Sequence, residues 1–176
     1  LDVIPSKGGG RWLALSLLES KKDESVPVIR FEAPKGWDDF GKVSEETRNA
    51  EVLEFFNEHL KPVLENLPTK ANSFYGLDFA RKQNACSFWP LIEQQNTKKK
   101  IPFLFEMFKV PYKQQEEFLK LIVDKLPNFS KGAHDAGGNG GFLAEAMQVK
   151  YGERIEAIML TESWYREHTP HFKASL

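Results

Sequence analysis

The chain has little cysteine, which limits how its fold can be stabilised. Cys86 is the single cysteine among 176 residues, so an intrachain disulfide is excluded, and a reducing compartment fits this composition. Because Cys86 lies in an apolar run, we interpret it as a small buried hydrophobic residue. The sequence also lacks an apolar run near the roughly 20 residues that span a membrane, and no signal peptide opens the chain. We therefore expect no membrane association.

A net charge of either sign is also missing. Lysine and arginine number 24 and aspartate and glutamate 25, which gives a formal net charge of −1. The bulk charge gives no indication of nucleic-acid binding, although local lysine and arginine clusters can still form a phosphate-binding face. What the chain does have is apolar and aromatic side chains, because 41% of its residues are hydrophobic and 14 are phenylalanine. This composition indicates a globular core rich in large rings and excludes a disordered chain.

Residues 1–72 differ from the rest, and we interpret them as a helical and linker extension. A β-branched run at 26–31 predicts one strand. Ser44 is a suitable N-cap for a helix whose apolar residues recur at helical spacing as far as Leu67. Pro62 lies inside this pattern, so we predict a kink or a break there.

Residues 73–176 are typical of three strands followed by alternating helices and strands. Short polar turns separate the three strands, which predicts an antiparallel meander at 73–79, 85–92 and 101–110. Pro90 inside the second strand indicates an edge position or a bulge. The later elements alternate as helix, strand, helix, strand and helix, at 113–126, 131–135, 142–151, 155–160 and 162–176. This order predicts an α/β domain with the mixed sheet of the RNase H-like fold.

Asp78 is the strongest candidate for a functional residue. It stands near the end of an otherwise apolar strand, and a carboxylate among buried neighbours is costly unless a cation or hydrogen-bond donors compensate. Magnesium prefers oxygen ligands, so a metal ligand is one interpretation of Asp78. The alternative is a water-facing aspartate at an edge or a turn.

Asp135 is the second candidate, at the end of a strand and before a glycine-rich turn. In an RNase H-like order this strand lies beside the first one, so we expect Asp78 and Asp135 to approach each other. Two such carboxylates can share divalent metal ions that activate water, while the alternative is an ordinary aspartate before glycine. The sequence leaves the roles of two other residues open. His134 can assist the site, bind DNA or be structural, and Glu106 can face the site or the solvent.

Basic residues follow the first strand and fill the next hairpin, near the proposed site. Arg81 and Lys82 come shortly after the strand, and Lys98, Lys99 and Lys100 occupy the hairpin tip. Hairpin tips can reach backbone phosphates, which supply much of the affinity for nucleic acids. We predict that these five residues bind DNA, with a solvated turn as an equal alternative for the three lysines.

Four segments together resemble the large terminase subunits of Mu-like phages and prophages. These segments are GLDFAR at 76–81, FWPL at 88–91, HDAGGNG at 134–140 and ESWYRE at 162–167, and the resemblance extends over nearly the whole chain. Large terminases join an N-terminal packaging ATPase to a C-terminal RNase H-like nuclease that cuts viral DNA with divalent metals. The resemblance therefore implies a metal-dependent endonuclease in which Asp78 and Asp135 are the first and second catalytic, metal-binding acids.

The same resemblance implies domains, cofactors and partners. Residues 1–72 would connect a missing ATPase domain to a nuclease domain at 73–176, which would stop before the family's third acid. The expected cofactor is Mg²⁺ or Mn²⁺ in a two-metal site. The expected partners are double-stranded viral DNA, the portal protein and the small terminase subunit, at the procapsid in the cytoplasm of a bacterial host. We expect this piece to be weakly active or inactive without the third acid.

Two other functions stay open from the sequence. The same fold can serve as a non-catalytic module of the packaging motor that grips DNA or docks on the portal, with structural acids. It can also belong to another RNase H-like enzyme, such as a resolvase or a transposase, since one fold hosts many functions. A preference for branched DNA would favour the resolvase.

Overall fold

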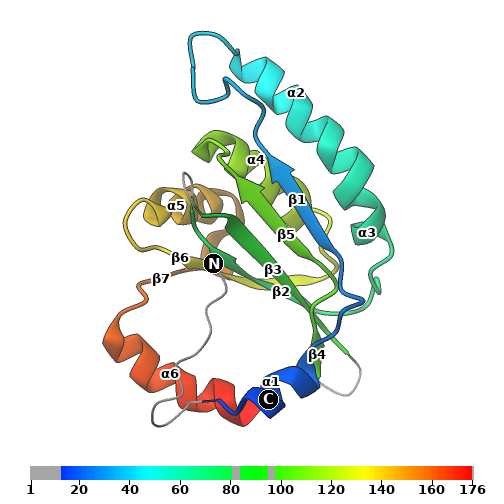
Figure 1. Cartoon of the computed structure of the whole chain (residues 1–176), viewed down its shortest axis with the longest axis vertical. Helices are drawn as coiled ribbons and strands as arrows, with labels where there is room; N and C mark the ends of the chain where they lie inside the picture. Colours follow the sequence, from blue (N-terminus) through cyan, green and yellow to red (C-terminus); the bar gives the residue numbers. More distant parts are fainter. Residues whose placement is uncertain (1–12, 81–83, 95–97, 176) are drawn as a thin grey trace.

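The computed structural model describes residues 13–80, 84–94 and 98–175 (Figure 1). Within these residues, seven strands form one mixed sheet: β1 (Val28–Glu32), β2 (Ser73–Asp78), β3 (Cys86–Glu93), β4 (Lys99–Lys100), β5 (Leu104–Phe108), β6 (Phe129–Asp135) and β7 (Ile155–Ile158). The α-helices are α1 (Leu15–Lys21), α2 (Glu45–Phe55), α3 (Lys61–Glu65), α4 (Tyr112–Val123), α5 (Gly140–Tyr151) and α6 (Glu162–Ser175). None of the helices in the described part of the chain is long and apolar enough to cross a membrane.

The strands run in the order β1-β5-β3-β2-β6-β7, and β4 pairs with β3 beside this path. β2, β3 and β5 form the predicted antiparallel meander. β6 then lies parallel to β2, and β7 lies parallel to β6. This mixed α/β sheet is compatible with an RNase H-like fold, so the predicted fold class is confirmed.

The segment before residue 73 contributes to the same sheet and core. β1 pairs parallel with β5 over its whole length, from Val28 opposite Leu104 to Glu32 opposite Phe108. The buried Val52 and Phe56, which follow β1 in the chain, belong to the same hydrophobic cluster as the sheet. The interpretation of residues 1–72 as a connection to another domain stays a prediction.

The helix that follows β1 stays continuous through Pro62 and changes to a π-helical turn just before it, so the predicted kink or break stays a prediction. Ser44 caps its start, because the Ser44 Oγ accepts a hydrogen bond of 3.1 Å from the Thr47 amide. α2 then passes into a π-helical turn at Phe56–Leu60, and α3 resumes with Pro62 in its first turn. Proline lacks the N–H that a helix interior needs, so the altered turn lies just where proline would remove a hydrogen bond.

One face of the sheet packs against helices and carries the core, and we call it the closed face. Phe88, Phe105 and Met107 are fully buried there, and the Phe105 ring meets Phe118 of α4 edge-on at 5.1 Å between centroids. We call the other side the open face, where Trp89 of the central strand β3 is 41% exposed. In Figure 1, α1 and α6 stand apart from the sheet at the lower edge. The two faces therefore differ strongly in their access to water.

Of the two settings expected for Pro90, a sheet edge or a bulge, the sheet edge is wrong. β3 is internal, between β2 and β5, and Pro90 lies opposite Tyr75 of β2. On its other side β3 pairs with β5 up to Phe88 and with β4 from Ile92 onward. Proline cannot donate to a ladder, and Pro90 falls within the gap between these two described pairings. An interrupted ladder, and not a sheet edge, accommodates it.

Candidate metal site on the open face

Two aspartates lie at neighbouring strand ends on the open face. Asp78 is the last residue of β2, and Asp135 is the last residue of β6. The parallel register places Leu77 opposite His134, which sets Asp78 beside Asp135. Leu77 and His134 are buried on the closed face, and side chains alternate along a strand, so both carboxylates lie on the open face. The predicted approach of the two acids is confirmed.

The surroundings of Asp78 disfavour its negative charge. The residue is exposed, yet the partial withdrawal of its carboxyl group from water raises its pKa, and the neighbouring charge of Asp135 raises it further. Like charges held together in this way favour protonation of one group unless a cation compensates. A divalent cation between the two carboxylates would offset both causes.

The glycine-rich turn after β6 orients the Asp135 carboxylate. Its Oδ1 accepts a hydrogen bond of 2.8 Å from the Gly137 amide. α5 begins at Gly140, which lies so close to the strand end that an added Cβ would overlap the Asp135 carbonyl oxygen. Glycine is therefore required where the helix starts against the strand. The turn holds Asp135 at the edge of the open face.

The donor set fits a hard divalent cation. Carboxylate oxygens are the ligands that Mg²⁺ prefers, and adjacent carboxylates are typical of its sites. The row of side chains continues from Asp78 to Ser87, Glu106 and Arg30 on the next three strands. Glu106 is already paired, because its Oε2 accepts a hydrogen bond of 2.6 Å from Arg30 Nε. Among the described residues, no group of three or more acidic, histidine or cysteine side chains is arranged to hold a metal, so this part of the chain offers two candidate ligands.

His134 lies in the core, away from the two carboxylates. It is fully buried, and its Nε2 shares a hydrogen bond of 2.7 Å with Tyr75 Oη. Burial lowers the pKa of His134 to about 4, so the ring is neutral near neutral pH. The structural alternative for His134 is the one that the geometry supports. Sequence analysis missed the Tyr75 contact, although strand alternation already requires His134 and Asp135 to face opposite sides.

The expectation that the triple lysine lies near the acids was wrong. Lys99 and Lys100 form β4, which pairs with the end of β3 at Glu93 and Ile92. Asp78 pairs with the other end of β3, roughly 15–20 Å away along the strand. The reason is that β3 runs antiparallel to β2 and carries the hairpin back to the start of β2.

The assignment of the five basic residues to DNA binding stays a prediction. Arg81 and Lys82 lie outside the described residues. Lys99 is engaged within the chain, because its Nζ lies 3.6 Å from Glu93 Oε1 and 5.5 Å from the Phe74 ring centroid. Neither contact prevents an exposed lysine from exchanging a partner for a phosphate, since surface ion pairs contribute little.

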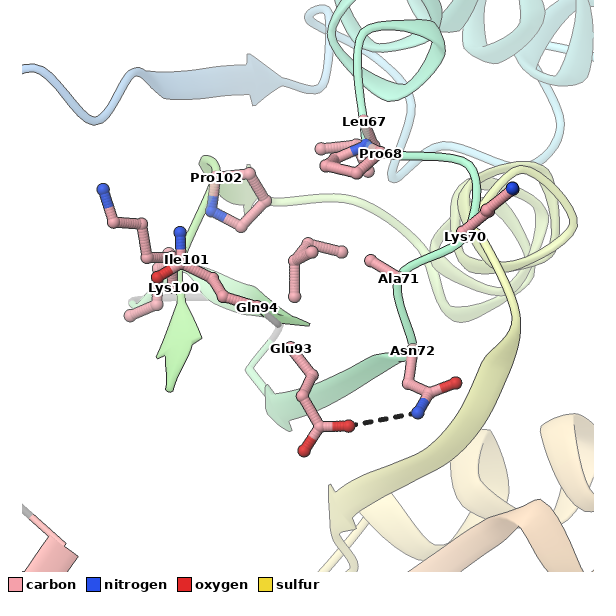
Figure 2. A pocket seen from close by; sticks show the side chains of 11 residues that line it. Leu67, Pro68, Lys70, Ala71, Asn72, Glu93, Gln94, Lys100, Ile101 and Pro102 are labelled. Carbon is pink, nitrogen blue, oxygen red and sulfur yellow. Dashed lines mark hydrogen bonds between the residues drawn. The ribbon is translucent and has the colours of Figure 1, made fainter. Parts of the chain in front are cut away.

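A surface pocket of about 790 Å³ lies at the same far end of the sheet. Figure 2 shows Asn72 and Glu93 at one side of it, joined by a hydrogen bond of 3.0 Å, and Pro68 and Pro102 at the other. These residues flank the start of β2, whereas the two aspartates lie at its end. The carboxylate pair therefore belongs to the open face of the sheet and does not line this pocket.

Two known proteins are similar to the chain over almost its whole length. It is 39% identical over 173 residues to the probable terminase large subunit gp28 of Escherichia phage Mu. It is 31% identical over 172 residues to the Mu-like prophage FluMu protein gp28 of Haemophilus influenzae. Each alignment covers 97% of this chain. The chain is homologous to part of these gp28 proteins.

This homology confirms the resemblance to large terminase subunits of Mu-like phages and prophages. The chain spans 31% and 33% of the lengths of the two relatives, which is about a third. No family model matches the chain, and no solved structure matches it either.

Proposed function

We propose that this chain carries the nuclease centre of a phage DNA-packaging terminase. The observation that carries the proposal is the pair formed by Asp78 and Asp135 at adjacent parallel strand ends. The name of the phage Mu relative, a probable terminase large subunit, supports the same conclusion. The substrate would be double-stranded viral DNA, with the portal protein and small terminase subunit as partners. The place of action would be the procapsid, in the cytoplasm of a bacterial host.

In this proposal Asp78 and Asp135 hold Mg²⁺ or Mn²⁺. When bound, such ions activate water for phosphodiester hydrolysis and stabilise charge on the leaving 3′ oxygen. Asp135 enters the site already oriented by the Gly137 amide. Asp78 has a raised pKa, so a proton competes with the metal for its carboxylate. Metal binding should therefore strengthen as the pH rises through the pKa of Asp78.

The position of the two acids on the open face suits a polymeric substrate. Small molecules bind in concave pockets that bury most of their surface, and neither the pocket at the start of β2 nor the pocket at the loop after β1 is lined by Asp78 or Asp135. A carboxylate pair on an open sheet face can instead meet the backbone of a long duplex. Contacts to phosphate carry no sequence information, so we expect cutting with low sequence selectivity.

The experiment is plasmid nicking with Mn²⁺, using this chain and a form extended at the C-terminus along the gp28 sequence. We expect robust nicking by the extended form and weak nicking by the 176-residue chain, because the described residues offer two ligands. Asp78→Asn in the extended form should abolish cleavage and spare DNA binding. Equal cutting by both lengths would instead show that a further acid is dispensable.

Glu106→Gln is the matched control for this experiment. Glu106 lies on the same open face and in the same row as Asp78, with Ser87 between them. Its carboxylate is held by Arg30, so its loss should leave nicking within about twofold of the wild type. Undiminished nicking by both Asp78→Asn and Asp135→Asn would exclude the proposed site.

A non-catalytic module that grips DNA or docks on the portal is the second candidate. The observation that favours it is that no group of three candidate ligands occurs among the described residues. Under this alternative the extended form binds DNA but does not nick it, with or without Asp78. A resolvase would be indicated by selective cutting of branched DNA over linear duplex.

A further inference from the structure

A buried tyrosine–histidine pair joins the two strands that carry the aspartates. Tyr75 Oη and His134 Nε2 share a hydrogen bond of 2.7 Å, and the two rings meet edge-on at 5.4 Å. Tyr75 is 3% exposed and His134 is 0% exposed. Tyr75 lies three residues before Asp78, and His134 directly precedes Asp135. The contact therefore lies on the closed face, immediately behind the candidate site.

Gly132 makes this contact possible. The register places Tyr75 opposite Gly132, so the tyrosine ring crosses over Gly132 to reach His134 two residues further along β6. A Cβ added at Gly132 would overlap the Tyr75 ring and lie 2.8 Å from its hydroxyl oxygen. Any larger residue at this position would displace the ring. Tyr75, Gly132 and His134 therefore depend on one another for the contact between β2 and β6.

The pairing of β2 with β6 needs such a device because it is irregular at its start. Ser73 lies opposite Phe129 and Phe74 opposite Lys131, so the register shifts between these two pairs. A slip of one residue on β6 would turn Asp135 to the closed face and His134 to the open face. The Tyr75–His134 hydrogen bond forms only in the register that sets Asp78 beside Asp135.

A polar pair is not the arrangement that packing alone would favour. The Nδ1 atom of His134 is buried and has no hydrogen-bond partner among the described residues. Two apolar rings would fill the same space without burying polar atoms. Buried polar contacts can instead specify a register at some cost in stability. The pair therefore contributes more to the choice of register than to the stability of the fold.

We propose that Tyr75 and His134 are positioning residues for the carboxylate pair. Their hydrogen bond holds β2 and β6 in the register that keeps Asp78 and Asp135 side by side for a shared divalent cation. Gly132 provides the space for the bond. This inference rests on the proposed function, because it assumes that the two carboxylates bind metal.

The test is a calorimetric titration of the 176-residue chain with Mn²⁺ alone, which measures the affinity for the ion. Tyr75→Phe removes the hydroxyl, and the double variant Tyr75→Phe/His134→Phe replaces both partners with apolar rings. We expect both to weaken Mn²⁺ binding about tenfold, the loss typical when groups that position metal ligands are removed. The double variant leaves no orphaned polar atom, so its Tm should stay close to or above that of the wild type.

Tyr151→Phe is the matched control. The Tyr151 hydroxyl donates a hydrogen bond of 2.8 Å to Asp124 Oδ1, in the helical layer on the closed face. Its loss should lower the Tm and leave Mn²⁺ affinity unchanged. His134→Gln offers a second check, because the glutamine amide can still bond to Tyr75 and should retain affinity better than His134→Phe.

The outcomes separate the inference from the proposed function. Wild-type Mn²⁺ affinity in Tyr75→Phe, alongside a loss in Asp78→Asn, would overturn the positioning role and leave the metal site intact. Equal losses in Tyr75→Phe and Tyr151→Phe would indicate a general effect of stability and would also overturn it. Equal binding by the wild type and Asp78→Asn/Asp135→Asn would contradict the proposed function itself.

Discussion

The same strands build both faces of the sheet, yet the two faces have different properties. The closed face is dry and aromatic, and it contains Phe88, Phe105 and the Tyr75–His134 pair. The open face carries Asp78 and Asp135 beside an exposed Trp89. Because side chains alternate with a period of two, each strand supplies core residues and open-face residues independently. The closed face can therefore stabilise the chain while the open face keeps its charges available.

Neighbouring residues show the contrast most directly. His134 and Asp135 are adjacent in the chain, but one is buried in the core and the other faces outward. Burial lowers the pKa of His134, whereas partial burial and a like charge raise the pKa of Asp78. Both shifts favour the uncharged form of the group. Variants that act on one face only should therefore separate stability from metal chemistry.

The largest effect is expected from a large core ring. Phe118→Ala removes a side chain that is 0% exposed and meets Phe31 and Phe105 edge-on. It should lower the free energy of unfolding by about 3–5 kcal/mol. Trp89→Ala on the open face should lower it by less than about 1 kcal/mol. Urea denaturation followed by circular dichroism measures both, and equal losses would contradict the distinction between the faces.

Two glycines in adjacent strands provide the next comparison. Gly132→Ala forces the Tyr75 ring to move and should destabilise the chain by about 1–3 kcal/mol. Gly76→Ala on β2 meets nothing within 4 Å, so it should be neutral or stabilise by about 0.5 kcal/mol. The same urea titrations give both values. A clear loss in Gly76→Ala would show that the open face is covered at that point.

His134 should make the fold sensitive to acid. Its pKa is lowered from 6.5 to about 4 on folding, so the unfolded chain binds the proton more readily. The stability that follows from a neutral His134 is complete above pH 6.5 and is lost as the pH falls towards about 4. Melting curves between these values should show a smaller loss for Tyr75→Phe/His134→Phe than for the wild type. Parallel pH profiles would exclude His134 as the cause.

The titration of Asp78 should change the stability of the fold in the opposite direction from that of His134, and by a smaller amount. Its folded pKa is raised from 3.8, so the folded chain binds the proton more readily, and stability falls as the pH rises through that pKa. Asp78→Asn removes this penalty, so in the absence of divalent ions its Tm should exceed that of the wild type at pH 7. The difference should disappear below pH 3.8. A lower Tm for Asp78→Asn at pH 7 would show that the carboxylate has a stabilising partner.

Added Mn²⁺ should make the Tm of the wild type higher than that of Asp78→Asn. A ligand that binds only the folded state raises its stability, so Mn²⁺ should raise the Tm of the wild type and leave Asp78→Asn nearly unchanged. Chelation of the Mn²⁺ with excess EDTA should restore the metal-free values. The size of the wild-type increase at several Mn²⁺ concentrations also gives an affinity that is independent of calorimetry.

Much of the fold followed from local patterns. The element order and the Ser44 cap each depend on a few neighbouring residues, so sequence periodicity and capping chemistry were sufficient. The candidate acids were found because a carboxylate at the end of an apolar strand is unusual. Their proximity followed from the strand order of the expected fold.

The errors concern relations between distant segments. The position of Lys99 and Lys100 depends on where β3 ends relative to β2, and the environment of Pro90 depends on which strands flank it. Neither relation is encoded in local periodicity. His134 was left open because its environment depends on the face that helices cover.

The sequence by itself determined the alternation of the strands, the two aspartates and their place at strand ends. Only the tertiary structure decided which face stays open and which register β2 and β6 adopt. That register depends on the contact of Tyr75 with Gly132 and His134, which lie 57 and 59 positions later in the sequence. Contacts over such separations arise from packing and not from local propensity, because the same strand patterns are compatible with more than one alignment.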